Sequence, residues 1–295
     1  AIAGPRLLEH LADIQPHRHD WAQLVFSMTG AVRVMREYAR QEPLAGMIAE
    51  ETLPVLQVRN LTMNFGSGKN ALKAVDDVSL TVKQGEVLGL LGESGSGKSV
   101  TLRALMRLLP KRRTTIGGRI EVSGQDVIQM GDKALSAFRG KTVSMIFQEP
   151  MLALDPVYTI GDQIAESVVR HEGVSRRDGR ARALEMLERV RIPSAASRLD
   201  AYPHEMSGGM RQRAMIALAL ACRPKILLAD EPTTALDATV QIQILLLLRE
   251  LQAEFGMSMI FVTHDIGVAV EICDRIAVMY AGRILERGPV DDLFR

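Results

Sequence analysis

The sequence predicts an α/β fold with a mainly parallel sheet, and three observations carry that prediction. From Leu53 onward, apolar runs of strand length alternate with helical patterns, as in chains whose helices connect parallel strands. A glycine-rich loop joins one apolar run directly to a helix. Several runs end in a polar residue, at the edge where parallel sheets bind their ligands.

The composition is that of an ordinary globular protein. Hydrophobic residues make up 47% of the chain, and 36 basic against 35 acidic side chains give a net charge of +1. This balance excludes the broad basic surface of a nucleic-acid-binding protein, so no nucleic-acid partner is expected. The longest apolar runs, 214–222 and 244–248, are far shorter than the roughly 18 residues of a membrane-spanning helix. Any membrane association is therefore expected to come through a partner.

The first half of the predicted domain consists mostly of strands. Residues 56–65 and 78–82 are predicted strands, and 86–91 is a short strand that leads into the glycine loop. A helix continues over 101–109, and 142–148 is another strand.

No strand is predicted between residues 148 and 206. Amphipathic helices are expected at 160–171 and 180–192. A helical subdomain, at about 150–221, is therefore expected to be inserted into the sheet.

The alternating pattern then resumes. The expected elements are a helix over 210–222, a strand over 226–230, a helix over 241–255, a strand over 258–264 and a hairpin over 275–288 that bends at Ala281-Gly282.

Residues 1–52 do not follow this pattern. His17 and His19 stand close together, but two histidines are too few for a metal site and no third ligand follows at a useful spacing. Met47 lies just before the first strand and fits a natural start. We expect residues 1–52 to be an extension, such as a fusion remnant or a misplaced start, and residues 53–295 to be the working domain.

The loop GESGSGKS (92–99) carries the strongest chemical signal. It follows a strand and opens a helix, the setting that a phosphate-binding loop requires. Glycines let backbone N–H groups wrap a phosphate, Lys98 reaches the β- and γ-oxygens, and Ser99 offers a hydroxyl to Mg²⁺. The expected nucleotide contacts are Gly92, Glu93, Ser94, Gly95, Ser96, Gly97, Lys98, Ser99 and Val100.

The run ILLADE (226–231) supplies the acids that such a loop needs. Asp230 ends an apolar strand and is expected to hold Mg²⁺, while Glu231 is placed to polarise the attacking water. Gln148 and His264 also stand at strand ends. A parallel sheet would bring all of these groups to one edge, and that convergence is the argument for a shared site.

A second turn suited to anions is Ser207-Gly208-Gly209, which opens a long helix. A helix N-terminus favours an anion, and glycines permit close approach. The sequence therefore predicts two separate anion sites in one chain, the phosphate loop and this turn.

In this order the motifs resemble those of the ATP-binding subunit of an ABC transporter, over residues 53–295. The resemblance implies a P-loop NTPase (RecA-like) core, an N-terminal antiparallel β subdomain and an inserted helical subdomain. It implies ATP and Mg²⁺ as cofactors, with Phe65 stacked on adenine and Ser99, Gln148 and Asp230 around the metal. Glu231 would be the catalytic base and His264 the contact to the γ-phosphate.

The resemblance also implies that two subunits share each nucleotide. Ser207, Gly208 and Gly209 would bind the γ-phosphate held by the opposite subunit, and Asp237 of TALD (234–237) would lie across the dimer interface. The loop that contains Gln148 would meet a membrane subunit.

The motif SGGMRQR (207–213) and the segment FQEPMLALDPVYTIGDQIAE (147–166) resemble those of the ATP-binding subunits of oligopeptide, dipeptide and nickel importers. Such a subunit hydrolyses ATP at the cytoplasmic face of the membrane to drive solute import, with peptides as the first expectation. Its implied partners are two permeases, a second ATPase that is identical or homologous, and an extracytoplasmic solute-binding protein. Nickel, opines and glutathione remain open as cargo.

Two further function classes fit the sequence less well. A soluble ABC-type ATPase of DNA repair or translation would carry a long coiled-coil or zinc insertion, or two nucleotide domains, and the sequence has none of these. A subunit that binds ATP without hydrolysing it is disfavoured by the presence of both Glu231 and His264.

Overall fold

A computed structural model describes residues 54–66, 71–110, 112–234 and 236–293, apart from the side chain of Leu152. The predicted extension over 1–52, with His17, His19 and Met47, lies outside the described residues. Among the described helices, none is both long and apolar enough to cross a membrane.

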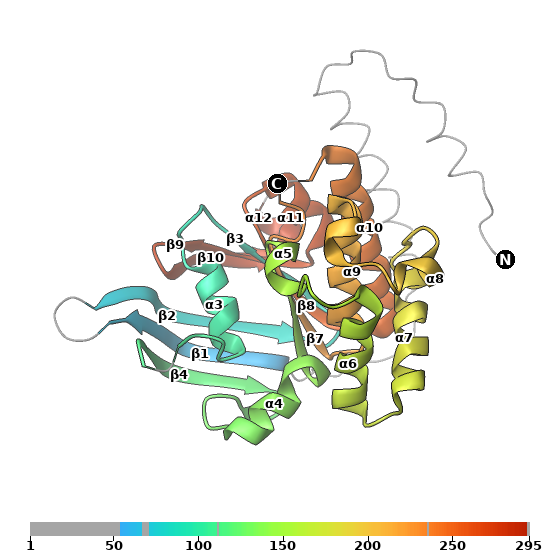
Figure 1. Cartoon of the computed structure of the whole chain (residues 1–295). Coiled ribbons are helices and arrows are strands. Elements are labelled where there is room, and N and C mark those ends of the chain that lie inside the picture. The colour runs from blue at the N-terminus through green and yellow to red at the C-terminus, as the bar shows by residue number, and fades with distance from the viewer. Residues whose placement is uncertain (1–53, 67–70, 111, 235, 294–295) are drawn as a thin grey trace, which may run out of the picture. The chain divides into compact units, whose positions relative to one another are not determined.

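The described residues form two sheets (Figure 1). The larger has the strand order β10-β9-β3-β8-β7-β6, and its strands from β9 to β6 run parallel to one another. Its strands are β3 (Val87–Leu91), β6 (Val143–Ile146), β7 (Ile226–Asp230), β8 (Ser258–Thr263), β9 (Arg275–Tyr280) and β10 (Arg283–Pro289). The antiparallel edge strand β10 is the second half of the predicted hairpin.

The smaller sheet is antiparallel, with the order β2-β1-β4-β5. Its strands are β1 (Pro54–Phe65), β2 (Leu72–Lys83), β4 (Thr114–Val122) and β5 (Gln125–Asp126). The sequence pattern predicted β1 well but made β2 too short and did not identify β4 or β5. These strands have many half-exposed positions, and Gly117 and Gly118 interrupt the alternation in β4.

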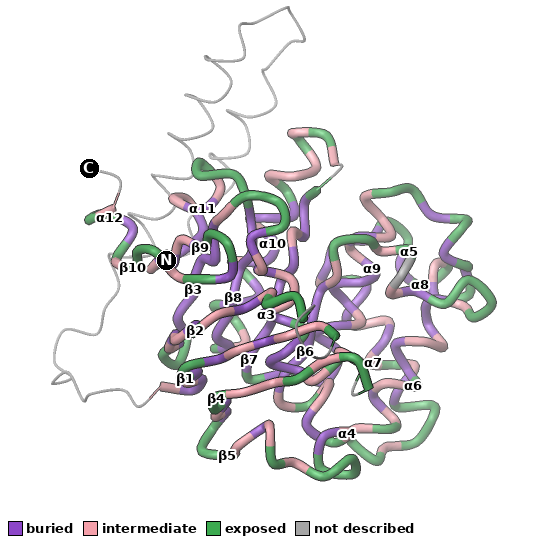
Figure 2. The backbone as a smooth tube through the Cα atoms, turned by 90° about the vertical axis from the view of Figure 1, so that its left-hand side faces the viewer, coloured by how far each residue is buried: buried purple, intermediate pink, exposed green. Residues whose placement is uncertain are grey.

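Alternating residues of the central strands enter two hydrophobic clusters. Leu227 and Phe261 pack on one face of the parallel sheet, with the helices. Leu228 and Val262 pack on the other face, with the antiparallel sheet. Figure 2 shows the buried segments along these central strands and the exposed ones in the connections. Strands covered on both faces are continuously apolar, which is why the sequence identified them.

Helices cover the parallel sheet and build the inserted region. Those of the core are α3 (Lys98–Leu105), α4 (Asp132–Lys141), α10 (Ala238–Phe255), α11 (Ile266–Ile272) and α12 (Val290–Leu293). Those between β6 and β7 are α5 (Pro150–Ala153), α6 (Ile160–Glu172), α7 (Arg176–Arg189), α8 (Ala195–Arg198), the 3₁₀ helix η2 (Pro203–Glu205) and α9 (Gly208–Leu220).

Several helix ends differ from the sequence expectation because side chains cap them. Ser175 accepts a hydrogen bond from the backbone N–H of Asp178, so α7 begins four residues before the predicted Arg180. Asp237 caps α10 in the same way. Helix α3, by contrast, ends at Leu105 and not at the predicted Leu109, because Arg107 adopts a left-handed backbone with φ of 50°.

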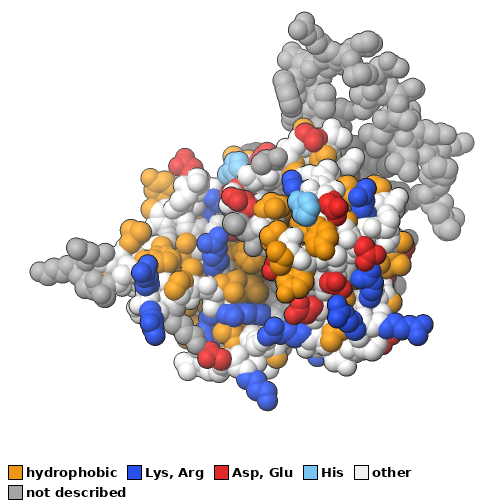
Figure 3. Space-filling model, viewed as in Figure 1, with side chains coloured by type: hydrophobic (Ala, Val, Ile, Leu, Met, Phe, Trp, Pro, Cys, Tyr) orange, Lys and Arg blue, Asp and Glu red, His pale blue; other side chains and the backbone are white. Residues whose placement is uncertain are grey.

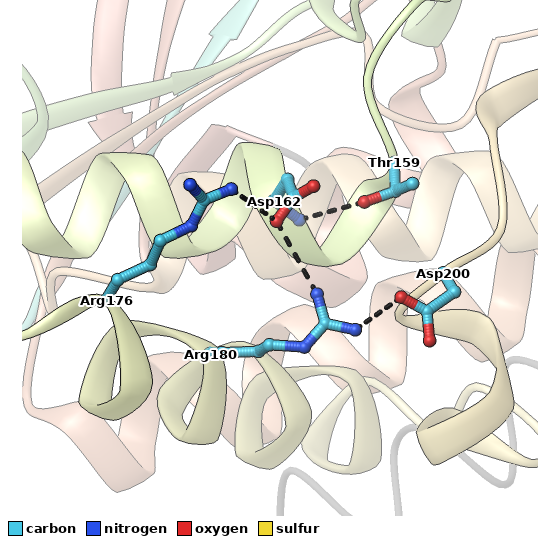
Figure 4. A network of polar contacts seen from close by, with 5 residues as sticks. All are labelled: Thr159, Asp162, Arg176, Arg180 and Asp200. Carbon is cyan, nitrogen blue, oxygen red and sulfur yellow. Dashed lines mark hydrogen bonds and ion pairs between the residues drawn. The ribbon is translucent and has the colours of Figure 1, made fainter.

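A network of charged side chains ties the helical region together (Figure 4). Asp162 on α6 accepts hydrogen bonds from Arg176 and Arg180 of α7, at 3.3 and 3.5 Å. Arg180 also donates to Asp200, which follows α8. Because these residues come from three consecutive segments, the network holds α6, α7 and the approach to η2 together.

Candidate active site

The parallel strands deliver the predicted polar residues to one edge of the sheet. The loops after β3, β6, β7 and β8 line a single cavity of about 870 Å³. The predicted residues that line it are Phe65, Gly92, Glu93, Ser94, Gly95, Gly97, Lys98, Ser99, Val100, Gln148, Glu231 and His264. The fold therefore brings together groups that are up to 199 positions apart in the sequence, from Phe65 to His264 (264 − 65 = 199).

The phosphate loop is closely fitted to its surroundings. Gly95 and Gly97 have φ of 79° and 106°, a backbone conformation that side chains rarely adopt. A Cβ on Gly92 would lie 2.2 Å from the carbonyl oxygen of Met279, so this position has no room for a side chain. These glycines hold the loop close to the neighbouring backbone at the N-terminus of α3.

Lys98 is the cation of the loop. Its ammonium donates to the carbonyl oxygens of Gly92 and Glu93, at 2.7 and 2.8 Å. Burial lowers the pKa of Lys98, and the negative charges of Glu231 and Asp230 oppose that shift. The buried hydroxyl of Ser96 has no hydrogen-bond partner among the described residues. The unpaired Ser96 hydroxyl and the Lys98 ammonium, which bonds only to its own loop, are donors to which a polyphosphate would supply hydrogen-bond acceptors.

Ser99 and Asp230 fit the predicted metal site. The Ser99 hydroxyl donates to Oδ1 of Asp230 at 2.8 Å, and Asp230 is 1% exposed. Burial raises the pKa of Asp230, while the Ser99 hydrogen bond and the charge of Arg103 lower it. Mg²⁺ takes oxygen ligands and keeps phosphate and water in its shell, so one hydroxyl and one carboxylate are a suitable protein contribution. Among the described residues, no group of three or more His, Cys, Asp or Glu side chains is placed to hold a metal ion.

Glu231 lies at the centre of a polar cluster. Its Oε2 accepts hydrogen bonds from Nε2 of Gln148 at 3.2 Å and from Oγ1 of Thr234 at 2.9 Å. Nδ1 of His264 is 3.5 Å from the same oxygen. The backbone of Glu231 is left-handed, with φ of 45°, although the residue is not glycine. Strained backbone of this kind occurs frequently at functional sites.

The sequence reading missed part of the cavity wall. Leu72, Ala74, Leu91 and Ile266 also line the cavity, and Leu72 is paired with Phe65 across the β1–β2 ladder. Leu72 is 68% exposed, and together with Phe65 it provides an apolar surface beside the phosphate loop. Such a surface suits a flat aromatic base. The apolar periodicity of β2 was too weak to single out Leu72.

The second anion turn lies outside this cavity lining. Ser207 caps α9 by accepting from the backbone N–H of Met210 at 3.3 Å, and a Cβ on Gly208 would meet only open space. A Cβ on Gly209 would lie 3.2 Å from Val240, whose backbone N–H donates to Asp237. The turn over 207–209 and the start of α10 are therefore neighbours. Within the described residues neither lines the cavity that contains Lys98.

Comparisons with known proteins agree with this geometry. The family model described as ABC transporter matches residues 75–234. The chain is 51% identical over 247 residues to a Brucella abortus (strain 2308) protein named "Putative peptide import ATP-binding protein", covering 84% of this chain and 74% of that protein. It is also 51% identical over 241 residues to a "Probable peptide ABC transporter ATP-binding protein" of Sinorhizobium fredii (strain NBRC 101917 / NGR234), covering 81% and 72%.

Solved structures support the same assignment. The dimeric post-hydrolysis state of the ATP-binding cassette MJ0796, bound to ADP and Pi, matches with a TM-score of 0.71 and 30% identity, covering 80% of this chain and 98% of that chain. The cbiO1 protein of Clostridium perfringens, part of the ABC transporter complex cbiONQ, matches with a TM-score of 0.69 and 28% identity, covering 82% and 90%. The predicted P-loop fold and ATPase class are confirmed: the chain belongs to the ABC transporter family, as an ATP-binding subunit.

Proposed function

We propose that this chain hydrolyses ATP, with Mg²⁺, to energise the import of peptides through a membrane transporter. The observation that carries the proposal is the convergence of the phosphate loop, Ser99 and Glu231 on one cavity, with the buried Asp230 hydrogen-bonded to Ser99. The names of the relatives, which refer to peptide import, support the choice of solute.

The chemistry assigned to the site is positioning and charge stabilisation. Lys98 and the N–H groups at the start of α3 offset the negative charge of the β- and γ-phosphates. Ser99 and Asp230, assisted by Gln148, would hold Mg²⁺, which neutralises charge on the phosphate oxygens when it is bound. Glu231 accepts a proton from water as the water oxygen bonds to the γ-phosphorus and the bond from that phosphorus to the β-phosphate oxygen breaks. His264 donates to the γ-phosphate oxygens that carry the developing charge.

Phe65 is assigned to adenine. It lies at the end of β1, paired with Leu72, and lines the same cavity as the phosphate loop. An aromatic face at this position stacks on a base without requiring a specific hydrogen bond.

The turn Ser207-Gly208-Gly209 and Asp237 are assigned to a dimer interface. Both lie outside the cavity lining of their own chain, which is the arrangement expected if they serve the nucleotide of a second subunit. The dimeric form of the related cassette supports this assignment. The partner ATPase is proposed to be an identical or a homologous chain.

The remaining partners are two permeases and, indirectly, an extracytoplasmic solute-binding protein. Figure 3 shows exposed hydrophobic side chains in the region of α5. Met151 of α5, and Val157 and Tyr158 in the segment before α6, are 45%, 69% and 57% exposed. This surface follows Gln148 and is a suitable contact for a permease loop at the cytoplasmic face of the membrane. Residues 53–295 are proposed as the nucleotide-binding domain, with its helical subdomain over about 150–221 and residues 1–52 as an extension.

Reconstituted transport tests the proposal. The chain would be assembled in lipid vesicles with its two permeases and binding protein, and uptake of a labelled oligopeptide would be measured with and without ATP. We expect ATP-dependent uptake, and none with the Lys98→Met variant. ATP hydrolysis with uptake of nickel but not peptide would contradict the solute, and absence of hydrolysis would contradict the function itself.

A further inference from the structure

We propose that Thr234 is the positioning residue for Glu231, an inference that rests on the proposed role of Glu231 as the general base. Thr234 stands three residues after Glu231 in the same turn. Its backbone N–H donates to the carbonyl oxygen of Glu231 at 3.2 Å, and its hydroxyl donates to Oε2 of the Glu231 carboxylate at 2.9 Å. The two residues therefore form a closed local unit, bonded through both main chain and side chain.

Such a unit is needed because the backbone alone does not fix the carboxylate. The left-handed φ of 45° at Glu231 sets the direction in which the side chain leaves the end of β7. Three rotatable bonds still separate the carboxylate from the backbone. A hydrogen bond from a residue in the same turn restricts those rotations, and a hydrogen bond to a charged acceptor is the stronger kind.

The other two neighbours of Oε2 come from different strand ends. Gln148 follows β6 and His264 follows β8, and their nitrogens lie 3.2 and 3.5 Å from the oxygen. Under the proposed function both side chains are also required elsewhere, Gln148 at the metal and His264 at the γ-phosphate. Thr234 belongs to the turn of the base and has no such second task. Its hydrogen bond is therefore the one that persists when nucleotide is bound.

The hydrogen bond from Thr234 also gives the two carboxylate oxygens of Glu231 different roles. The contacts with Gln148, Thr234 and His264 are all to Oε2, and among the described residues Oε1 accepts no hydrogen bond. Holding Oε2 leaves Oε1 to accept the proton from water. A hydroxyl is required at position 234 for this role, and the methyl group of threonine is not.

Substitution of Thr234 separates this role from a structural one. Thr234→Val keeps the shape but removes the hydroxyl, and Thr234→Ser keeps the hydroxyl. We expect Val to lower kcat for ATP hydrolysis about tenfold, the effect of losing one charge-assisted hydrogen bond, with KM for ATP changed less than about twofold. Serine should restore kcat to within about twofold of the unmodified chain. Thr115→Val, at an exposed position on β4, is the matched control.

A double variant completes the test. With Glu231→Gln already present, adding Thr234→Val should change the residual single-turnover rate little, because the group that it positions is altered. Equal losses in both backgrounds, failure of serine to rescue, or full activity of the valine variant would each overturn the inference. A chain that hydrolyses no ATP before any substitution would instead contradict the proposed function.

Discussion

Glu231, the proposed base, is the residue at which several polar groups of the site meet. The Glu231 side chain is 14% exposed, and its carboxylate lies beside groups from two other strand ends and from its own turn. The neighbouring Asp230 is almost fully buried and bonded to Ser99. Two adjacent acids thus face different tasks because a change of backbone conformation at residue 231 directs their side chains to different partners.

Replacing Glu231 by Gln should separate binding from turnover. The amide keeps the size of the side chain but does not accept a proton from water, so we expect kcat to fall by about 10²–10³. ATP affinity, measured by fluorescence titration of a nucleotide analogue, should change little. Glu286→Gln, at an exposed position on β10, is the control. Near-normal hydrolysis by the Glu231 variant would remove it from the role of base.

At the scale of elements, one buried side chain connects α9 to the turn after β7. Gln212 is 2% exposed, and its side-chain amide donates to the carbonyl oxygen of Pro232, next to Glu231. The same helix begins at Ser207. Gln212 therefore joins the helix of the proposed partner-nucleotide turn to the segment that carries the base.

Gln212→Leu should weaken both the fold and the reaction. The variant leaves the Pro232 carbonyl buried without its donor, which costs about 1–3 kcal/mol of unfolding free energy. Chemical denaturation would measure that loss, and kcat should fall because the turn of Glu231 is less firmly held. Gln125→Leu, at an exposed position, is the matched control. Unchanged stability would mean that the hydrogen bond contributes nothing.

The contact between α4 and α6 gives a second element-scale effect. His171 packs on Gly140, where a Cβ would lie 2.6 Å from its Nε2. Burial, followed by the charges of Arg170 and Lys141, lowers the pKa of His171 from its ordinary 6.5. The unfolded chain therefore binds the proton more readily than the folded one.

This sign predicts a stability that is lost in acid. The contribution of neutral His171 is fully present above about pH 6.5 and is lost as the pH falls through the lower folded-state pKa. The melting temperature should therefore drop between about pH 7.5 and 5.5, and His171→Gln should show a smaller drop. An identical pH profile for the two proteins would show that His171 does not contribute to the acid sensitivity.

At the scale of the whole molecule, the two elements proposed to bind anions do not line the same cavity. Lys98 and its loop line the cavity, whereas Ser207 caps α9 outside that lining. The chain by itself therefore presents half of each of two proposed sites. Closure of a dimer would complete both.

Mixing two inactive variants tests this arrangement. Ser207→Arg should prevent hydrolysis of the nucleotide bound by the partner subunit, and Glu231→Gln should prevent hydrolysis of the nucleotide bound by the chain itself. If the dimer consists of two identical chains, a mixed dimer has one site with neither defect. We expect each variant alone to be nearly inactive and the mixture to recover part of the ATPase rate. A mixture with no recovery would contradict a shared site between identical chains.

The central strands and the phosphate loop could be predicted because their signals are local. A strand buried on both faces is apolar throughout, and GESGSGKS carries its own strand–loop–helix context. The antiparallel sheet was harder to predict. The half-exposed pattern of β4, interrupted at Gly117 and Gly118, resembles that of a loop. Thr234 gave no signal, because its role depends on the direction of another residue's carboxylate.

The sequence by itself predicted the residues of the proposed chemistry: a phosphate loop, a proposed metal-binding pair, a proposed base and a second turn suited to anions, in the order of one family. Only the tertiary structure decided which of these groups meet. Gln148 and His264 both approach Oε2 of Glu231, because parallel strands end at the same edge of the sheet. Ser207 lies outside that cavity because the inserted helices place α9 elsewhere. Residue types are local, but convergence depends on strand order and helix placement, which are set by packing of the whole core.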